Sequence, residues 1–162
     1  MVGLNDWARK FLDGRRHAVL ATHNEDGSIH QTPVWYMLRD DELFVGSASF
    51  SRKVKNVAAR PAASLVVDAR IPGLERWVSA AGPVTILRGE QSQTINAAIQ
   101  QRYLTPEALN HPQIGPGFAA GDDVTLRIAP TKWLSWASTD VDAQFFGGLL
   151  TATPEKWFRP VD

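Results

Sequence analysis

The chain has 162 residues and 44% hydrophobic content, which is enough for one domain with its own core and too little to expect two. Its 17 Lys and Arg residues balance 17 Asp and Glu residues, so no long-range field draws the protein to nucleic acid or an anionic membrane. Cysteine is absent, which excludes disulfides, thiolate chemistry and Cys-ligated metals, and no apolar run approaches the ~20 residues that span a bilayer. The N-terminus opens without a basic region and apolar signal segment, and we therefore expect a single cytoplasmic domain over residues 1–162.

A helix is predicted at the start of the chain. Apolar residues follow helical spacing over residues 4–12, Asn5 or Asp6 can serve as the N-cap, and Gly14 can end the helix. We expect this helix to pack on the core.

Three strands that form a meander are predicted after this helix. They are expected over residues 17–23, 28–38 and 43–47, joined by a hairpin turn at 24–27 and an acidic turn at 39–42. Pro33 interrupts the middle strand, which indicates an edge, a bulge or a position where the ladder needs no N–H donor.

A segment rich in cations follows the meander. Ser49-Phe50-Ser51 leads into Arg52, Lys53 and Lys55, which occupy the first turn of a predicted helix that Pro61 ends. A cation in the first turn costs about 0.3–1 kcal/mol, because the helix dipole already places positive potential there. The cluster therefore favours a bound phosphate, and the alternative is a solvated basic surface.

The second half of the chain is predicted to add four strands and a long helix. The strands are expected over residues 64–69, 76–87, 124–129 and 132–137, and the helix over 91–104. Gly82-Pro83 should bend the second of these strands sharply. Residues 105–121 are rich in Pro and Gly and are predicted to form a loop that acts as a lid or contacts another subunit. Residues 138–162 form a tail in which no structure can be assigned.

Short strands joined by tight turns favour an antiparallel barrel, and the order of several motifs makes this more specific. The motifs are Ala18-Val19-Leu20-Ala21-Thr22, Asp26-Gly27, Thr32-Pro33-Val34-Trp35-Tyr36, residues 51–57, and Arg60-Pro61 ahead of Ser64-Leu65-Val66-Val67. In this order they resemble the pyridoxamine phosphate oxidase-like split β-barrel superfamily, and within it the flavin- and deazaflavin-dependent oxidoreductases. The resemblance covers residues 16–87, and residues 124–136 are similar to the closing strands. It implies a mainly β fold with a few helices, an antiparallel split β-barrel of the FMN-binding type.

The resemblance also implies where a coenzyme would bind. The coenzyme is expected in a groove between two protomers of a homodimer, with its phosphate held by Ser51, Arg52 and Lys53, and with Lys55 and Asn56 as neighbours. An Arg can hold a phosphate through two N–H groups, while Lys adds a mobile point charge.

The ring system of the coenzyme is expected along the second strand. The residues implied there are Thr32, Pro33, Val34 and Trp35, while the small residues Gly46 and Ser47 would let the tail pass close to the backbone. The opposite protomer would contribute Trp77, where pyridoxamine phosphate oxidases proper have a Gln. This departure argues against pyridoxamine phosphate as the substrate.

The function that the resemblance implies is hydride transfer between a bound flavin-type coenzyme and an unsaturated organic small molecule. The coenzyme would carry the chemistry, which explains why no catalytic dyad is visible, and Tyr36 is a candidate proton donor. The residues 32–35 and the pair Lys53 and Lys55 favour the deazaflavin coenzyme F420, whose tail carries extra carboxylates, with FMN close behind.

Two other functions stay open. One is a non-catalytic carrier of flavin or deazaflavin, and the other is a haem-handling split barrel in which a His would be the axial ligand. The His residues have no spacing typical of a metal site, and none is expected; they are His17, His23, His30 and His111. Nucleic acid is not an expected partner. The four clustered cations, Arg52, Lys53, Lys55 and Arg60, form a poor surface for tracking phosphates in a chain without net positive charge.

Overall fold

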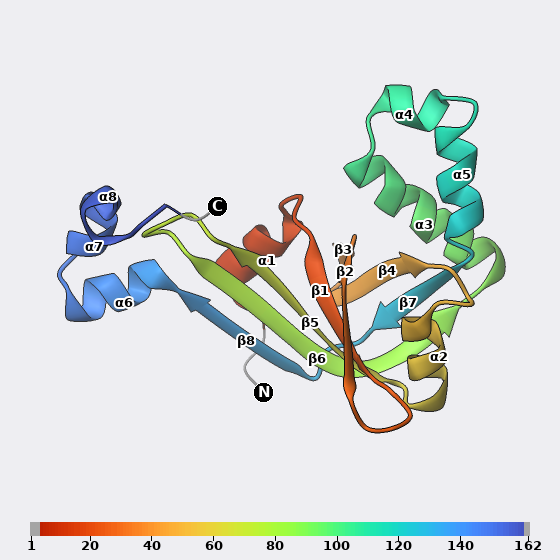
Figure 1. Cartoon of the computed structure of the whole chain (residues 1–162), viewed down its shortest axis with the longest axis horizontal. Coiled ribbons are helices and arrows are strands. Elements are labelled where there is room, and N and C mark those ends of the chain that lie inside the picture. The colour runs from red at the N-terminus through yellow and green to blue at the C-terminus, as the bar shows by residue number, and fades with distance from the viewer. Residues whose placement is uncertain (1–3, 161–162) are drawn as a thin grey trace.

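The computed structural model describes residues 4–160, which form eight strands in one antiparallel sheet (Figure 1). The strands are β1 (Ala18–His23), β2 (Ile29–Val34), β3 (Met37–Arg39), β4 (Glu42–Ser47), β5 (Ala62–Ala69), β6 (Arg76–Leu87), β7 (Val124–Ile128) and β8 (Lys132–Ala137). Their order in the sheet is β2-β1-β5-β6-β7-β4-β3, and β8 pairs with β6. This architecture confirms the predicted antiparallel split β-barrel.

Eight helices lie around this sheet within the described residues. They are α1 (Asp6–Asp13), α2 (Arg52–Ala59), α3 (Gly89–Tyr103), α4 (Pro106–Asn110), α5 (Ile114–Gly121), α6 (Ser138–Phe145), α7 (Leu149–Ala152) and α8 (Pro154–Trp157). Figure 1 shows α3, α4 and α5 together on one side, while α6, α7 and α8 extend beyond β8 on the opposite side. None of the helices within residues 4–160 combines the length and apolar character that a membrane span requires.

Strand β6 connects the two halves of the sheet. Residues 76–83 pair with β5, whereas residues 84–87 pair with β7. The change of partner falls at Gly82-Pro83, where the sequence predicted a bend. A Cβ on Gly82 would lie 2.3 Å from the carbonyl oxygen of Ala129, so only glycine permits the close approach of these two segments.

The predicted meander is wrong in one respect, because the strand expected over residues 28–38 is divided at Trp35 and Tyr36. Its first part, β2, pairs with β1, and its second part, β3, pairs with β4. At the break, the backbone N–H of Tyr36 donates to the hydroxyl of Tyr103 at 3.3 Å, and this hydroxyl lies 3.1 Å from the carbonyl oxygen of Tyr36. A side chain from α3 therefore replaces a neighbouring strand. Pro33 lies in β2 at the edge of the sheet, where proline is tolerated.

The opening helix forms as predicted. Asn5 is its N-cap and accepts a hydrogen bond from the backbone N–H of Ala8 at 2.8 Å. Ala8, Phe11 and Leu12 are buried on the side of α1 that packs against the barrel core. The same core cluster contains inward-facing residues of the strands, together with Val54 and Val57 of α2. Both helices and the sheet therefore share one core.

The predicted loop over residues 105–121 is wrong, because the structure has α4 and α5 there. Thr105 caps α4 by accepting from the N–H of Ala108 at 3.2 Å. A Cβ on Gly115 would lie 2.1 Å from the carbonyl oxygen of Leu109, so the glycine allows the two helices to pack closely. Pro116 lies in the first turn of α5, where no N–H donor is needed. The Pro and Gly content that indicated a loop is thus part of a helical hairpin.

The tail also contains helices, which the sequence did not indicate. The buried carboxylate of Asp142 accepts hydrogen bonds from the backbone N–H groups of Leu150 at 3.0 Å and Thr151 at 2.8 Å. It therefore joins α6 to α7. Four large apolar residues of this tail are exposed, namely Phe145, Phe146, Leu149 and Trp157.

Candidate functional site

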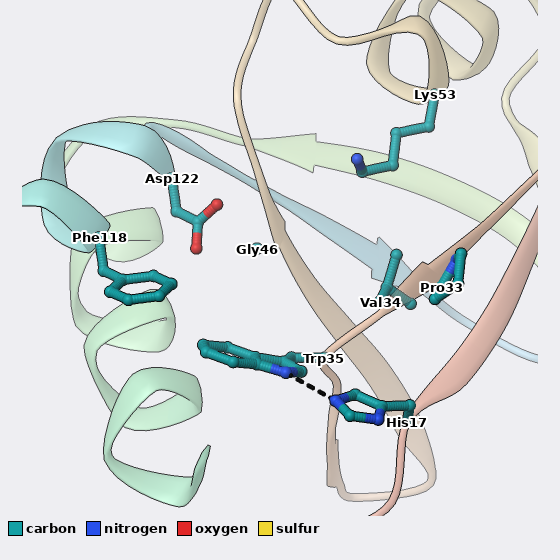
Figure 2. Close-up of a pocket in the computed structure, with 8 residues that line it drawn as sticks. All are labelled: His17, Pro33, Val34, Trp35, Gly46, Lys53, Phe118 and Asp122. Carbon is teal, nitrogen blue, oxygen red and sulfur yellow. Dashed lines mark hydrogen bonds between the residues drawn. The ribbon is translucent and has the colours of Figure 1, made fainter. Parts of the chain in front are cut away.

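Two adjoining cavities lie between the barrel and the α3–α5 helices. The first has a volume of about 330 Å³ and is lined by His17, Pro33, Val34, Trp35, Gly46, Lys53, Phe118 and Asp122 (Figure 2). The second, of about 580 Å³, shares Gly46, Lys53, Phe118 and Asp122 with the first and continues past Ser47 and Ser51 toward α5. Because they share four residues, we treat the two cavities as one groove.

An aromatic stack forms one wall of the groove. The ring of Trp35 stacks on that of Tyr103, with centroids 5.0 Å apart and planes at 3°, and on that of Phe118, at 5.3 Å and 23°. The indole N–H of Trp35 donates to Nε2 of His17 at 3.0 Å, so this nitrogen carries no proton in the described arrangement. The wall brings together residues from the N-terminal segment, the break after β2, α3 and α5.

The polar end of the groove is formed by Lys53 and Asp122. Both side chains are half-buried, and Figure 2 shows them on opposite sides of the same space. Burial lowers the pKa of the Lys53 ammonium, and the Asp122 carboxylate acts in the opposite direction. Burial also raises the pKa of the Asp122 carboxyl, while the nearby Gln100 amide and the Lys53 ammonium oppose that shift. Both groups are therefore moved toward their neutral forms.

Glycine at position 46 allows two side chains to lie close to the floor of the groove. A Cβ there would lie 3.0 Å from Oδ1 of Asn96 and 3.2 Å from Oδ2 of Asp122. Behind this floor, Nδ2 of the buried Asn96 donates to the carbonyl oxygens of Asp122 at 2.9 Å and Val124 at 3.0 Å. Its Oδ1 accepts from the hydroxyl of Thr125 at 2.7 Å. This buried network holds the backbone of Asp122 at the rim of the groove.

The start of α2 faces the groove and lacks a side-chain cap. Ser51 is the N-cap residue, but its side chain makes no capping hydrogen bond, and its Oγ lies 3.0 Å from Oγ of Ser47. The first turn has no acidic residue. Because uncapped N–H groups and the helix dipole both favour an anion, this end of α2 is suited to a phosphate.

The structure separates the residues of the predicted phosphate site. Ser51 and Lys53 line the groove, whereas Arg52 and Lys55 line a cavity of about 440 Å³ on another side of α2. Asn56 is buried, and its Nδ2 donates to Thr22 at 3.0 Å and to Asn24 at 2.9 Å. Its amide hydrogens are therefore used to fasten α2 to the first hairpin.

Of the residues predicted to lie along the coenzyme ring, some line the groove and others do not. Pro33, Val34, Trp35, Gly46 and Ser47 line the groove. Thr32 lies in β2 and lines neither cavity, and Trp77 lies in β6 beside Trp136 of β8, also outside them.

Tyr36 is fully buried, away from the groove. Its hydroxyl donates to the carbonyl oxygen of Leu12 at 2.7 Å, and burial raises its pKa strongly. A phenol in this environment keeps its proton, so the structure does not support Tyr36 as a proton donor to a ligand in the groove.

Three residues of the groove were missed by sequence reasoning. His17 was considered only as a metal or haem ligand, and Phe118 belongs to the segment that was predicted to be a loop. Asp122 follows that segment directly, and no motif marks it. Across residues 4–160, no three His, Asp or Glu side chains gather closely enough to hold a metal ion.

Comparisons with known proteins bear on this site. The family model described as pyridoxamine 5'-phosphate oxidase matches residues 4–137. No curated protein matches the chain.

Three solved structures illustrate the likeness in fold. A conserved hypothetical protein from Mycobacterium tuberculosis has a TM-score of 0.71 and 23% identity, with 87% of this chain and 89% of that chain covered. A structure described as an F420 reductase has a TM-score of 0.64 and 23% identity, covering 78% and 94%. A haem storage protein from Vibrio cholerae has a TM-score of 0.62 and 15% identity, covering 83% and 94%. At these identities the likeness concerns the fold.

Proposed function

The chain belongs to the pyridoxamine 5'-phosphate oxidase family, and on that premise we propose that its groove binds a flavin-type coenzyme for hydride transfer to an unsaturated organic substrate. The observation that carries the proposal is the composition of the groove. It has a flat aromatic wall at Trp35, a floor without a side chain at Gly46, and an ammonium group at Lys53 beside an uncapped helix start.

The residues of the groove fit such a coenzyme in shape and charge. The two cavities have volumes typical of sites for small molecules and cofactors. A Cβ on Gly46 would meet Oδ1 of Asn96 and Oδ2 of Asp122, so the glycine lets these two side chains lie close against the groove floor. Lys53 and the N–H groups of the α2 start supply the positive potential that a phosphate needs.

Of the two coenzymes, F420 fits the charge pattern better than FMN. Lys53 faces the groove, and Arg52 and Lys55 extend the positive surface around the exposed side of α2. A coenzyme tail with carboxylates beyond its phosphate would meet these cations as it leaves the groove. The fold likeness to an F420 reductase agrees with this choice.

The bound coenzyme would supply the hydride, and the chain would supply position and environment. Trp35 and Phe118 provide flat apolar surfaces that orient a ring and exclude water from one side of it. Lys53 would hold an anionic group of the coenzyme at the polar end of the groove. No residue is required for covalent catalysis.

We also propose that the protein acts as a homodimer. Leu134 and Trp136, on the same face of β8, are 50% and 37% exposed, and the α6–α8 helices expose further apolar side chains. A second copy that covers this surface would remove it from water.

The test is a titration of the coenzyme-free protein with F420, FMN and haem, separately, monitored by fluorescence or absorbance. We expect the tightest binding for F420 or FMN. Lys53→Ala should raise the Kd for that coenzyme by about tenfold or more, because a hydrogen bond to a charged group contributes about 1.5–3 kcal/mol. Arg52→Ala should have the smaller effect.

Lys10→Ala is the matched control, because Lys10 is an exposed cation on α1 outside the groove. It should leave the Kd within about twofold of the unmodified protein. Binding of haem alone, with a Soret band, would replace the proposal by a haem-handling role. Tight binding of a coenzyme without turnover of any unsaturated acceptor would indicate a carrier.

A further inference from the structure

We propose that Asp122 is the proton donor of this groove, the group that delivers a proton to the carbon next to the one that receives the hydride. This inference rests on the proposed function and adds a catalytic residue to it. It is carried by the position of the carboxyl group, by the network that fixes it, and by the absence of a better donor in the groove.

Asp122 occupies the junction of the two cavities. It lines both of them, directly after α5, with the ring of Phe118 on the same wall. Its Oδ2 lies 3.2 Å from the place that a Cβ on Gly46 would take, so the carboxyl lies directly against the groove floor. A ligand ring in the first cavity, which Trp35 and Gly46 also line, would lie within reach of this group.

The backbone of Asp122 is held by a buried network. Nδ2 of Asn96 donates to its carbonyl oxygen at 2.9 Å, and Thr125 in turn donates to Oδ1 of Asn96 at 2.7 Å. Asn96 is 3% exposed; its bond to Thr125 is buried, and its bond to Asp122 is partly buried. The network fixes the backbone from which the carboxyl extends, and a fixed attachment favours the defined position that a general acid requires.

The surroundings of the carboxyl favour its protonated form. No described Lys or Arg within residues 4–160 makes a salt bridge to it. Burial raises the pKa of the carboxyl, and the nearby Gln100 amide and Lys53 ammonium oppose this shift without cancelling it. A carboxyl in a partly apolar cleft without an ion pair is the usual arrangement for an acid with a raised pKa.

The other polar groups of the groove are less suited to this role. Nε2 of His17 accepts the indole N–H of Trp35, so that nitrogen cannot donate a proton while the bond is made. Lys53 lies at the start of α2, where its charge would be engaged by a phosphate. The charged groups that face Asp122 are Lys53 from α2 and the adjacent Asp123, whose carboxylate accepts from the N–H of Ser49 at 2.6 Å.

The step balances as follows for an α,β-unsaturated ketone and a reduced flavin or deazaflavin. A hydride adds to the β-carbon, the electron pair of the C=C bond moves to the α-carbon, and a new C–H bond forms there with the proton of the Asp122 carboxyl. The coenzyme is left oxidised, the ketone is saturated, and the Asp122 carboxylate regains a proton from water. A quinone acceptor needs its proton on oxygen, which water supplies readily, so it does not depend on Asp122.

The experiment compares Asp122→Asn with the unmodified protein and with Glu107→Gln, a control that removes an exposed carboxylate from α4 of the same helical hairpin. Asn is close to Asp in shape, and the Asn96 contact is to the backbone, so the variant should fold. Cyclohex-2-en-1-one and menadione serve as acceptors in single-turnover reactions with the reduced coenzyme. Carboxyl-¹³C NMR of Asp in the coenzyme-free protein follows the titration of residue 122 directly.

The expected result is a loss of about 100-fold in the rate for the enone in Asp122→Asn, with the menadione rate and the Kd of the coenzyme within about threefold. The Glu107→Gln control should behave like the unmodified protein. In the NMR titration, one Asp resonance with a midpoint above the ordinary Asp pKa of about 3.9 should be present in the unmodified protein and absent from the variant.

Three results would overturn the inference. An enone rate in Asp122→Asn within threefold of the unmodified protein removes the proton role, and so does an NMR midpoint at or below the ordinary value. A large loss of coenzyme affinity in the variant would make Asp122 a coenzyme-positioning residue instead. If the unmodified protein binds neither F420 nor FMN, the proposed function fails with it, and that failure is visible without any variant.

Discussion

Replacing Asn96 of α3 with alanine should destabilise the protein, because the Asn96 side chain joins α3 to the backbone at Asp122 and Val124. Its Nδ2 donates to the carbonyl oxygens of Asp122 and Val124, and its Oδ1 accepts from Thr125; the last two bonds are buried and the first is partly buried. Asn96→Ala would remove a donor from both carbonyl groups and an acceptor from the Thr125 hydroxyl, and each buried group left unsatisfied costs about 1–3 kcal/mol. We expect a loss of about 3 kcal/mol in the free energy of unfolding, which corresponds to a Tm lowered by about 6–12 °C in a chain of this length.

Equilibrium unfolding in urea, followed by far-UV circular dichroism, measures this loss. Gln93→Ala is the matched control, because Gln93 is exposed on α3 and should change the free energy by less than about 0.5 kcal/mol. Asn96→Leu keeps the branched shape of the side chain, with a larger volume, but not the hydrogen bonds, and it should cost about as much as Asn96→Ala. A cost below about 1 kcal/mol for Asn96→Ala would show that the network does not hold Asp122 and β7 as described.

Three further predictions concern the groove, the tail and the surface. Trp35→Leu should raise the Kd of the bound coenzyme by about 3- to 10-fold, measured by titration, because an aromatic pair contributes about 0.5–1.5 kcal/mol; an unchanged Kd would place the ring elsewhere. Although burial opposes it, hydrogen bonds from Thr151, Leu150 and Gly148 lower the pKa of Asp142, so its contribution to stability is present above the ordinary Asp pKa and is lost as the pH falls through the lowered value. The protection factors of the Leu150 and Thr151 amides against hydrogen exchange should therefore fall only in acid, and Asp142→Ala should lower them at neutral pH; equal protection in both proteins would contradict the role of this carboxylate. Light scattering should give a dimer of the 17.9 kDa chain, and Leu134→Glu should shift it toward monomer, whereas a stable monomer that binds coenzyme tightly would refute the dimer.

The barrel could be predicted from local patterns, because strands and turns depend on neighbours in the sequence. The alternation of residues 18–23 and the turn around Gly27 indicated the first hairpin, and the cap at Asn5 indicated α1. The break at Tyr36 could not be found in this way, since it depends on the hydroxyl of Tyr103, 67 residues further along the chain. Long-range hydrogen bonds of this kind leave no local pattern.

The helical hairpin of α4 and α5 shows why a high Gly and Pro content wrongly predicted a loop. Gly115 and Pro116 are unfavourable in the middle of a helix but harmless near its start, and the glycine is required where Leu109 packs against α5. Only the tertiary contact explains the residue. Phe118 and Asp122 were missed for the same reason, because they enter the groove through the position of this hairpin.

The sequence by itself determined the antiparallel barrel, the family resemblance and the cationic start of α2, since these rest on the order of short motifs. The tertiary structure decided which cations face the groove. Residues that are adjacent in a helix lie about 100° apart around its axis, so Lys53 enters the groove while Arg52 faces another cavity. It also decided that Lys53 is joined there by Trp35 and Asp122, because residues far apart in the chain meet only when the barrel and the α3–α5 helices pack together.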